Sequence, residues 1–242
     1  MKETEKLDQL ASAYESPMGF LSIRLISKYT YKLIQDRIEG KKVLILGLGD
    51  GYIINKLVER EVFEITVLEG SRTLIKKYSH LNGQCRILHT LFENFIDWEH
   101  FDTIIATHIL EHVEDPLTIL EMARKVLNKK GIAIFTVPNA YSLHRRVGVK
   151  MKLISFEREL NKQDLEVGHR RVFTPGGFRS ILESAGFELE HFQGYLLKII
   201  SNEQMANWSP KLLDALFNLS LELPLEICAS MAAFCRRGQA SE

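Results

Sequence analysis

The chain has 242 residues, of which 45% are hydrophobic, so it is long enough to bury a large core in a single domain with additions. Its 31 basic residues balance its 31 acidic residues, and the formal net charge is +0. A neutral chain has no global field that attracts nucleic acid or an anionic membrane, so neither is expected as a partner.

The three cysteines, Cys85, Cys228 and Cys235, are widely separated and include no C-x-x-C pair. Such a set is typical of a reduced cytoplasmic protein, and it favours neither a disulfide framework nor a zinc site. The N-terminus lacks the apolar run of a signal peptide, and charged residues and a proline interrupt the apolar region at 212–234. We therefore expect a cytoplasmic protein without a membrane span and without a bound metal.

Residues 1–40 are expected to form a helical addition to the main domain. Pro17 follows Ser16 at the start of a run whose apolar residues recur at helical spacing, and Gly40 ends this run. The simplest interpretation is a helix that packs on the core. The alternative is a lid that brings Tyr14 over a substrate.

The stretch V-L-I-L-G-L-G-D-G at 43–51 organises the rest of the chain. Four apolar residues of strand-forming type lead into three glycines, and an amphipathic helix is expected at 53–60. Glycine lets a ligand approach the main chain, and the free N–H groups that open a helix face such a ligand. We infer a nucleotide-type cofactor site at the carboxyl end of a parallel strand. A dinucleotide is less favoured, because its fingerprint places the third glycine one residue later, where Tyr52 stands.

Glu69 ends a second strand, expected at 64–68, roughly 20 residues beyond the glycines. A carboxylate at this position accepts hydrogen bonds from both hydroxyls of a ribose. Taken alone, Glu69 has the alternative of an ordinary solvated loop acid. Its spacing from the glycines favours the cofactor role.

Alternation of strands and helices continues along the chain. Asp115 and Pro116 suit the N-cap and the first turn of a helix. The segment T-L-F-E at 90–93 offers apolar and aromatic surface to a purine, although Phe92 suits the core equally well. The pattern predicts a doubly wound parallel sheet with ligands at the carboxyl ends of its strands. Strands are expected at 85–89, 101–107 and 131–138, and helices at 73–81 and 116–127.

These segments resemble, in order, the motifs of class I S-adenosylmethionine-dependent methyltransferases. The matching segments are the glycine stretch, Glu69, F-D-T-I-I-A-T-H-I-L-E-H-V-E-D-P at 101–116 and L-N-K-K-G-I-A-I-F-T-V-P-N at 127–139. The resemblance covers about residues 43–187 and is to the subgroup with an L-E-H-V-x-D-P stretch. It implies an α/β, Rossmann-like fold with a seven-stranded sheet whose last strand is antiparallel, and S-adenosyl-L-methionine as cofactor with S-adenosyl-L-homocysteine as product. The cofactor contacts that it implies are Gly47, Gly49, Gly51, Glu69, Thr107 and His108. The further candidate cofactor contacts are Leu48, Gly70, Leu91 and Phe92.

Two residues depart from the family pattern. Ile45 stands where the family usually has an acid near the ammonium of the cofactor, and Leu91 stands where it often has an aspartate beside the adenine. The G-x-G-D-G form is also similar to aminopropyltransferases of the spermidine synthase type, which use decarboxylated S-adenosylmethionine. That activity and a non-catalytic, methyltransferase-like binding protein are the two alternatives.

Two polar segments are expected at the carboxyl edge, where loops build substrate sites. They are N-A-Y-S-L-H-R-R at 139–146 and G-H-R-R-V-F-T at 168–174. The second is similar to a G-H-x-R-x-F-T segment of small-molecule O-methyltransferases of the quinone-pathway type, in which the histidine lies beside the acceptor. Arginines bind carboxylate or phosphate through two hydrogen bonds, so a small acceptor with an anionic group is expected. The candidate substrate contacts are Tyr14, Tyr141, His144, Arg145, Arg146 and Arg170.

A sulfonium methyl group is already activated, so the protein mainly holds the acceptor in line, and a histidine base helps where the acceptor is a hydroxyl. We expect O-methylation with His169 as the base and His108 as the second candidate. His112 is expected to be structural. The alternative for the arginines is surface pairing with Asp164, Glu157 or Glu159.

The rest of the chain completes one methyltransferase domain over 41–242, expected as a monomer or homodimer. The connection at 194–222 is expected to form a cap near the substrate. Helices are expected at 175–184 and 210–221, and strands at 187–192 and 227–236.

Overall fold

The computed structural model describes residues 3–13, 17–96, 100–200, 202–205 and 208–238. Its centre is a seven-stranded sheet in the order β3-β2-β1-β4-β5-β7-β6. β7 runs antiparallel to both β5 and β6, and the other pairs are parallel. The expected fold class is confirmed. The strands are β1 (Lys42–Leu46), β2 (Glu64–Glu69), β3 (Arg86–His89), β4 (Phe101–Thr107), β5 (Leu127–Pro138), β6 (Phe187–Tyr195) and β7 (Ser230–Arg237).

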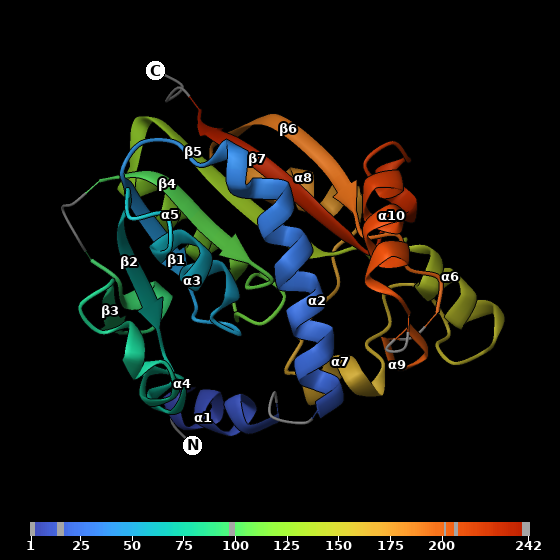
Figure 1. Ribbon diagram of the computed structural model, residues 1–242. Helices are drawn as coiled ribbons and strands as arrows, with labels where there is room; N and C mark the ends of the chain where they lie inside the picture. The colour runs from blue at the N-terminus through green and yellow to red at the C-terminus, as the bar shows by residue number, and fades with distance from the viewer. Residues whose placement is uncertain (1–2, 14–16, 97–99, 201, 206–207, 239–242) are drawn as a thin grey trace.

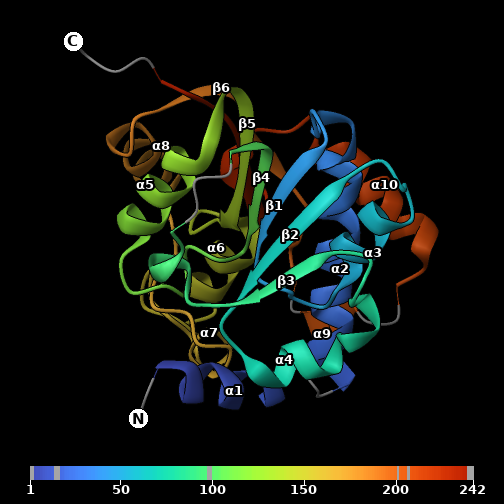
Figure 2. The ribbon, with the colours of Figure 1, turned by 90° about the vertical axis from the view of Figure 1, so that its left-hand side faces the viewer.

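Helices cover both faces of the sheet, and the two views in Figure 1 and Figure 2 show the three layers. α2, α3 and α10 lie on one face, while α5 and α8 lie on the other. Each face has its own buried apolar cluster, centred on residues such as Tyr29 and Leu57 on the first and Leu120 and Phe178 on the second. The helices are α1 (Glu3–Ala13), α2 (Pro17–Ile34), α3 (Tyr52–Val58), α4 (Arg72–Lys77), α5 (Pro116–Val126), α6 (Leu143–Lys150), α7 (Lys162–Glu166), α8 (Pro175–Ser184), α9 (Asn202–Met205) and α10 (Pro210–Ser220).

Three of these helices begin with the same local chemistry. The side chains of Asp115, Thr174 and Ser209 accept a backbone hydrogen bond from the first turn of α5, α8 and α10, and a proline follows each cap. The cap satisfies an N–H that the helix leaves without a partner, and proline at the next position needs no donor there. The sequence pattern therefore places these three starts correctly.

Several boundaries differ from the expected ones. α2 ends at Ile34 and the chain continues as a 3-10 turn (Gln35–Arg37), so the helix is shorter than the apolar pattern suggests. The helix expected at 73–81 is divided into α4 and a second 3-10 turn (Ser79–Leu81). β7 begins only at Ser230, because a 3-10 turn (Leu225–Ile227) follows Pro224, whose fixed φ of −56° suits that turn.

The first two helices reach the functional edge of the sheet. α1 lies beside α4 at the carboxyl ends of the strands (Figures 1 and 2). Asp8 of α1 accepts hydrogen bonds from the Ser71 hydroxyl at 2.7 Å and from the Thr73 N–H at 2.9 Å. α2 packs against α10 through the stacked rings of Tyr29 and Phe217, whose centroids are 4.8 Å apart.

The connection from β6 to β7 contains α9 and α10. Among the helices that the structure describes, none combines the length and the hydrophobicity that crossing a bilayer requires.

Candidate functional site

The glycine stretch forms an open backbone loop between β1 and α3. Gly47, Gly49 and Gly51 have φ values of 81°, 54° and 71°, the left-handed region that other residues rarely adopt. A Cβ on Gly47 would lie 2.9 Å from Cδ1 of Ile109, in the loop that follows β4. Conformation therefore favours glycine at all three positions, and the close approach of Ile109 adds a steric reason at Gly47.

Glu69 holds this loop against the end of β2. Its side chain is only 6% exposed, and it accepts hydrogen bonds from the N–H of Leu48 at 2.9 Å and from the N–H of Ser71 at 2.7 Å. Burial raises the pKa of the Glu69 carboxyl, while the backbone hydrogen bonds act in the opposite direction. Each carboxylate oxygen keeps a further lone pair, so the group can still accept hydrogen bonds from a ligand.

Apolar residues surround the backbone next to Glu69. A Cβ on Gly70 would meet the Leu7 side chain of α1 at 2.5 Å and the Leu91 side chain at 3.1 Å. Phe92 opens a 3-10 turn (Phe92–Asn94), and its Cζ lies 4.0 Å from the Cβ position of Gly47. Phe92, expected to line a purine, therefore lies next to the glycine loop, and Leu91 and Leu7 lie beside Gly70.

His108 follows Thr107, the last residue of β4, and has a left-handed φ of 54°. Its Nδ1 lies 3.1 Å from Oε1 of Glu111, and its Nε2 lies 3.2 Å from the hydroxyl of Tyr195. The Tyr195 hydroxyl is also 2.9 Å from the hydroxyl of Thr30 on α2. Both ring nitrogens of His108 therefore have partners within the protein.

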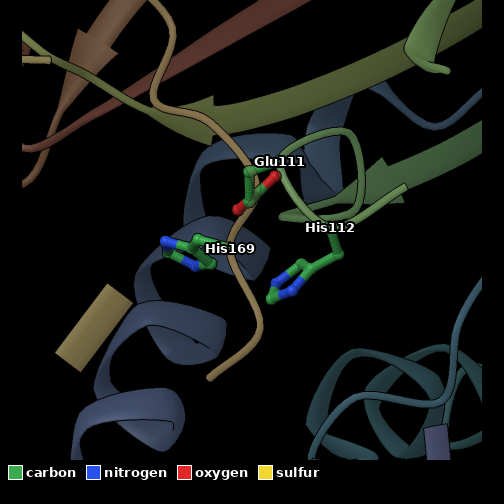
Figure 3. A group of neighbouring side chains, drawn as sticks. All are labelled: Glu111, His112 and His169. Atoms are coloured by element: carbon green, nitrogen blue, oxygen red, sulfur yellow. The ribbon is translucent and has the colours of Figure 1, made fainter. Parts of the chain in front are cut away.

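Glu111, His112 and His169 form a compact cluster beside this network, as Figure 3 shows. One ligand atom from each lies within 4.8 Å of the others, and the two histidine rings meet edge to face with centroids 4.7 Å apart. Burial lowers the pKa of His112 to about 4, so its ring is neutral at pH 7. A carboxylate and two imidazoles are ligands that divalent transition metals accept.

Backbone contacts join the two loops that carry this cluster. The N–H of Arg170 donates to the carbonyl oxygen of Glu111 at 2.8 Å, and its Nε donates to that of His112 at 3.0 Å. The Arg171 guanidinium donates to the carbonyl oxygens of Leu110 at 3.0 Å and Glu114 at 2.8 Å. Arginines of the G-H-R-R segment thus hold the loop after β4 in place.

His169 is oriented by a buried ion pair. Its Nδ1 lies 3.2 Å from Oδ1 of Asp164, and the other oxygen of Asp164 accepts from Arg145 at 3.0 Å. Burial alone would raise the pKa of Asp164, but its hydrogen bonds to His169, Asn161 and Arg145 outweigh burial and bring it to about 2. The Arg145 side chain is 5% exposed and also donates to the carbonyl oxygens of Glu157 and Glu159. Its donors are thus engaged within the protein.

The other candidate substrate contacts differ in exposure. Tyr141 and Arg146 are exposed, whereas His144 is half-buried and its Nδ1 is buried without a hydrogen-bond partner among the described residues. Burial, with Lys198 and Arg145 nearby, lowers the pKa of His144 to about 3. Burial also lowers the pKa of Lys198 to about 8. Tyr14 lies outside the described residues.

Sequence reasoning missed an ion pair at the glycine loop. Nη1 of Arg24, on α2, lies 3.2 Å from Oδ2 of Asp50, and the Arg24 guanidinium stacks over the Tyr52 ring at 4.4 Å. Ile45, where the family usually has an acid, is buried in the core. The aspartate between the second and third glycines is the feature of the sequence that indicates a polar group here.

Comparisons with known proteins agree with this architecture. A family model described as a methyltransferase domain matches residues 20–192, which is well over half of the chain. The chain belongs to this family. The match runs through the glycine loop, Glu69, His108, and the Glu111, His112 and His169 cluster, so these residues lie within the domain that defines the family.

Individual relatives of this methyltransferase-family chain are distant. It is 28% identical over 151 residues to the ubiquinone biosynthesis O-methyltransferase of Actinobacillus pleuropneumoniae, a match that covers 57% of this chain and 64% of the relative, which is under two thirds of its length. The same enzyme of Haemophilus ducreyi is 26% identical over 213 residues, covering 80% of this chain and 86% of the relative. A Thermotoga maritima structure described as a SAM-dependent methyltransferase, possible histamine N-methyltransferase, shares the fold with a TM-score of 0.67, 17% identity, and coverage of 98% of this chain and 100% of that one.

Proposed function

We propose that this protein transfers the methyl group of S-adenosyl-L-methionine to an oxygen of a small acceptor and releases S-adenosyl-L-homocysteine. The observation that carries the proposal is the buried Glu69 carboxylate, which is fixed by the N–H groups of Leu48 and Ser71 at the end of β2, next to the glycine loop. A carboxylate in that place suits the two hydroxyls of a ribose. Family membership over residues 20–192 supports the same cofactor.

Each part of the cofactor has a matching group at this edge. Glu69 would bind the ribose, and Gly70, Leu91 and Phe92 would enclose the adenine. Thr107 and His108 would face the methyl end. The backbone of the glycine loop, from Gly47 to Gly51, would lie along the amino-acid part.

The amino-acid end of the cofactor would be held by Arg24 and Asp50 in place of the acid that Ile45 replaces. A guanidinium suits the cofactor carboxylate, and an aspartate suits its ammonium group. The decarboxylated cofactor of aminopropyltransferases lacks the group that Arg24 would bind. Arg24 therefore favours methyl transfer over aminopropyl transfer.

The acceptor would lie against His169 rather than His108. Both ring nitrogens of His108 have partners in Glu111 and Tyr195, whereas His169 uses only Nδ1, for Asp164, among the described residues. Positioning an oxygen in line with the sulfonium methyl supplies roughly 7–11 kcal/mol of the barrier. His169 would then accept the proton of the acceptor hydroxyl, or it would position the group that accepts this proton.

The acceptor would be an anionic or hydroxylated metabolite. Nδ1 of His144 is buried without a hydrogen-bond partner among the described residues, and Lys198 lies near it. The exposed Arg146 and Arg170 add positive charge to the two polar segments. Arg145 is the least suitable candidate for substrate contact, because its donors are engaged by Asp164 and by two carbonyl oxygens. The free cysteines support a reducing, cytoplasmic location.

Calorimetry with S-adenosylhomocysteine tests the cofactor, and transfer of a labelled methyl group to a panel of phenolic, carboxylic and amine acceptors tests the reaction. We expect binding and transfer to an oxygen acceptor. Tighter binding of the decarboxylated cofactor would support aminopropyl transfer instead. Failure to bind either form at high concentration would support the non-catalytic alternative.

A further inference from the structure

The cluster of Glu111, His112 and His169 contains a buried oxygen that the protein leaves unsatisfied. Glu111 is 0% exposed, and its Oε2 has no hydrogen-bond partner among the described residues. Buried carboxylate oxygens are normally satisfied by protein groups, water or an ion, so this one indicates a missing partner. In Figure 3 the Glu111 carboxylate lies next to both histidine rings.

The second oxygen of Glu111 and the second ring nitrogen of His169 already have partners that orient these two side chains. His108 occupies Oε1 of Glu111 at 3.1 Å, and Asp164 occupies Nδ1 of His169 at 3.2 Å. Oε2 of Glu111 and Nε2 of His169 remain as the unoccupied atoms. A carboxylate on the far nitrogen of a histidine is the usual support of a metal-binding imidazole, and here Arg145 fixes that carboxylate in turn.

We propose that Glu111, His112 and His169 bind one divalent transition metal ion of the zinc type. Two imidazoles and one carboxylate form a three-ligand site whose fourth position is open to water or substrate. Bonds of 2.0–2.2 Å place tetrahedral ligand atoms about 3.4 Å apart, so the three atoms must close by roughly 1–1.5 Å from their widest separation of 4.8 Å. Rotation of the two imidazole rings about their side-chain bonds supplies this approach.

The spacing of the cysteines predicts no metal site, but the proposed ligands are not cysteines. They come from two segments far apart in the sequence, so their spacing does not reveal the site. The inference rests on the proposed function in one respect: an oxygen of the acceptor would occupy the open position. His169 would then act as a ligand that holds the metal, and the metal would lie next to the acceptor oxygen. Metal binding itself does not require that methyl transfer occurs.

Titration of the chelator-treated full chain with Co²⁺, followed by visible absorption, tests the site directly, and competition with Zn²⁺ measures the affinity. We expect one ion per chain with the absorption bands of a four- or five-coordinate site. His112→Phe and His169→Phe keep a ring but remove the ligand nitrogen, and each should weaken binding more than tenfold. His191→Phe is the matched control, since His191 lies on β6 and bonds Gln193.

Asp164→Asn tests the positioning of His169. It should weaken metal binding by roughly 10–100-fold, the usual cost of losing an outer partner, while the affinity for S-adenosylhomocysteine stays unchanged. A wild-type chain that binds S-adenosylhomocysteine but takes up neither Co²⁺ nor Zn²⁺ would overturn the metal site and leave the proposed function standing. A His169→Phe variant that binds the metal like wild type would overturn it as well. Uptake of metal without any binding of the cofactor product would instead contradict the proposed function.

Discussion

Replacing Glu69 with glutamine keeps the size of the side chain and removes its charge. The wild-type carboxylate accepts from the N–H groups of Leu48 and Ser71 and can accept from two ribose hydroxyls as well. The amide of Glu69→Gln has one acceptor oxygen, so its NH₂ group must face a donor. Hydrogen bonds to a charged group contribute about 1.5–3 kcal/mol each, and every 1.4 kcal/mol is tenfold in affinity. We therefore expect S-adenosylhomocysteine to bind about 10- to 100-fold more weakly.

Stability adds a second and independent readout for the same variant. Because burial raises the pKa of Glu69 above its unfolded value, its contribution is fully present below the unfolded pKa and is lost as the pH rises through the folded pKa. The stability of wild type relative to Glu69→Gln should therefore fall between acidic and neutral pH. Urea denaturation at both pH values measures the difference.

The control for both experiments is Glu64→Gln, at the exposed opposite end of the same strand. It should leave cofactor affinity unchanged. If Glu69→Gln bound S-adenosylhomocysteine within threefold of wild type, the ribose assignment would be refuted. If the stability of wild type relative to Glu69→Gln rose with pH, it would show that burial does not raise the pKa of Glu69.

Three further changes probe other parts of the site. Arg24→Met should weaken S-adenosylmethionine binding roughly tenfold and leave the decarboxylated form unaffected, because only the former has a carboxylate to pair with; calorimetry compares the two. Gly49→Ala should destabilise the fold by about 1–2 kcal/mol, the cost of a left-handed backbone, because its Cβ meets nothing within 4 Å. Gly51→Ala should destabilise it more, because its Cβ would also lie 2.6 Å from Cε1 of Tyr78. The urea midpoints of the two variants measure the difference. The fold lowers the pKa of His144 to about 3, so the folded state favours the neutral ring. The free energy of unfolding should therefore fall as the pH drops from about 6.5 towards 3, and it should fall less in His144→Asn. Urea denaturation at several pH values in this range measures both.

The sheet was predictable because its signals are local. The central strands are mostly apolar runs, and α5, α8 and α10 each begin at a cap followed by proline, so neighbouring residues determine these elements. Glu69 and the glycines were predictable for the same reason, since one strand, one turn and one helix set their spacing. Tertiary packing decided the boundaries that differ, such as the early end of α2 at Ile34.

The partners of the site residues were not predictable, because pairing depends on contacts between distant segments. His108 was identified as a candidate base, but its partner Tyr195 lies 87 residues further along the chain. Arg145 was expected at the substrate, with surface pairing to acids as the alternative. It does pair with Asp164, but it meets Glu157 and Glu159 through their carbonyl oxygens, which no residue identity encodes.

The N-terminal helix α2 contacts both ends of the proposed cofactor site. Ile45 is buried between β2 and β4, so an acid at that position would lie within an apolar cluster rather than at the ligand. Arg24 of α2 instead reaches the glycine loop at Asp50, and Thr30 of the same helix reaches His108 through the hydroxyl of Tyr195. A shift of α2 would therefore move the groups at the proposed amino-acid end and at the proposed methyl end together. The N-terminal helix is therefore more than a distant addition, because its side chains contact both the glycine loop and the hydrogen-bond network of His108. In the proposed site, Asp50 would take the place of the acid that Ile45 replaces, and Arg24 would hold Asp50 and the cofactor carboxylate.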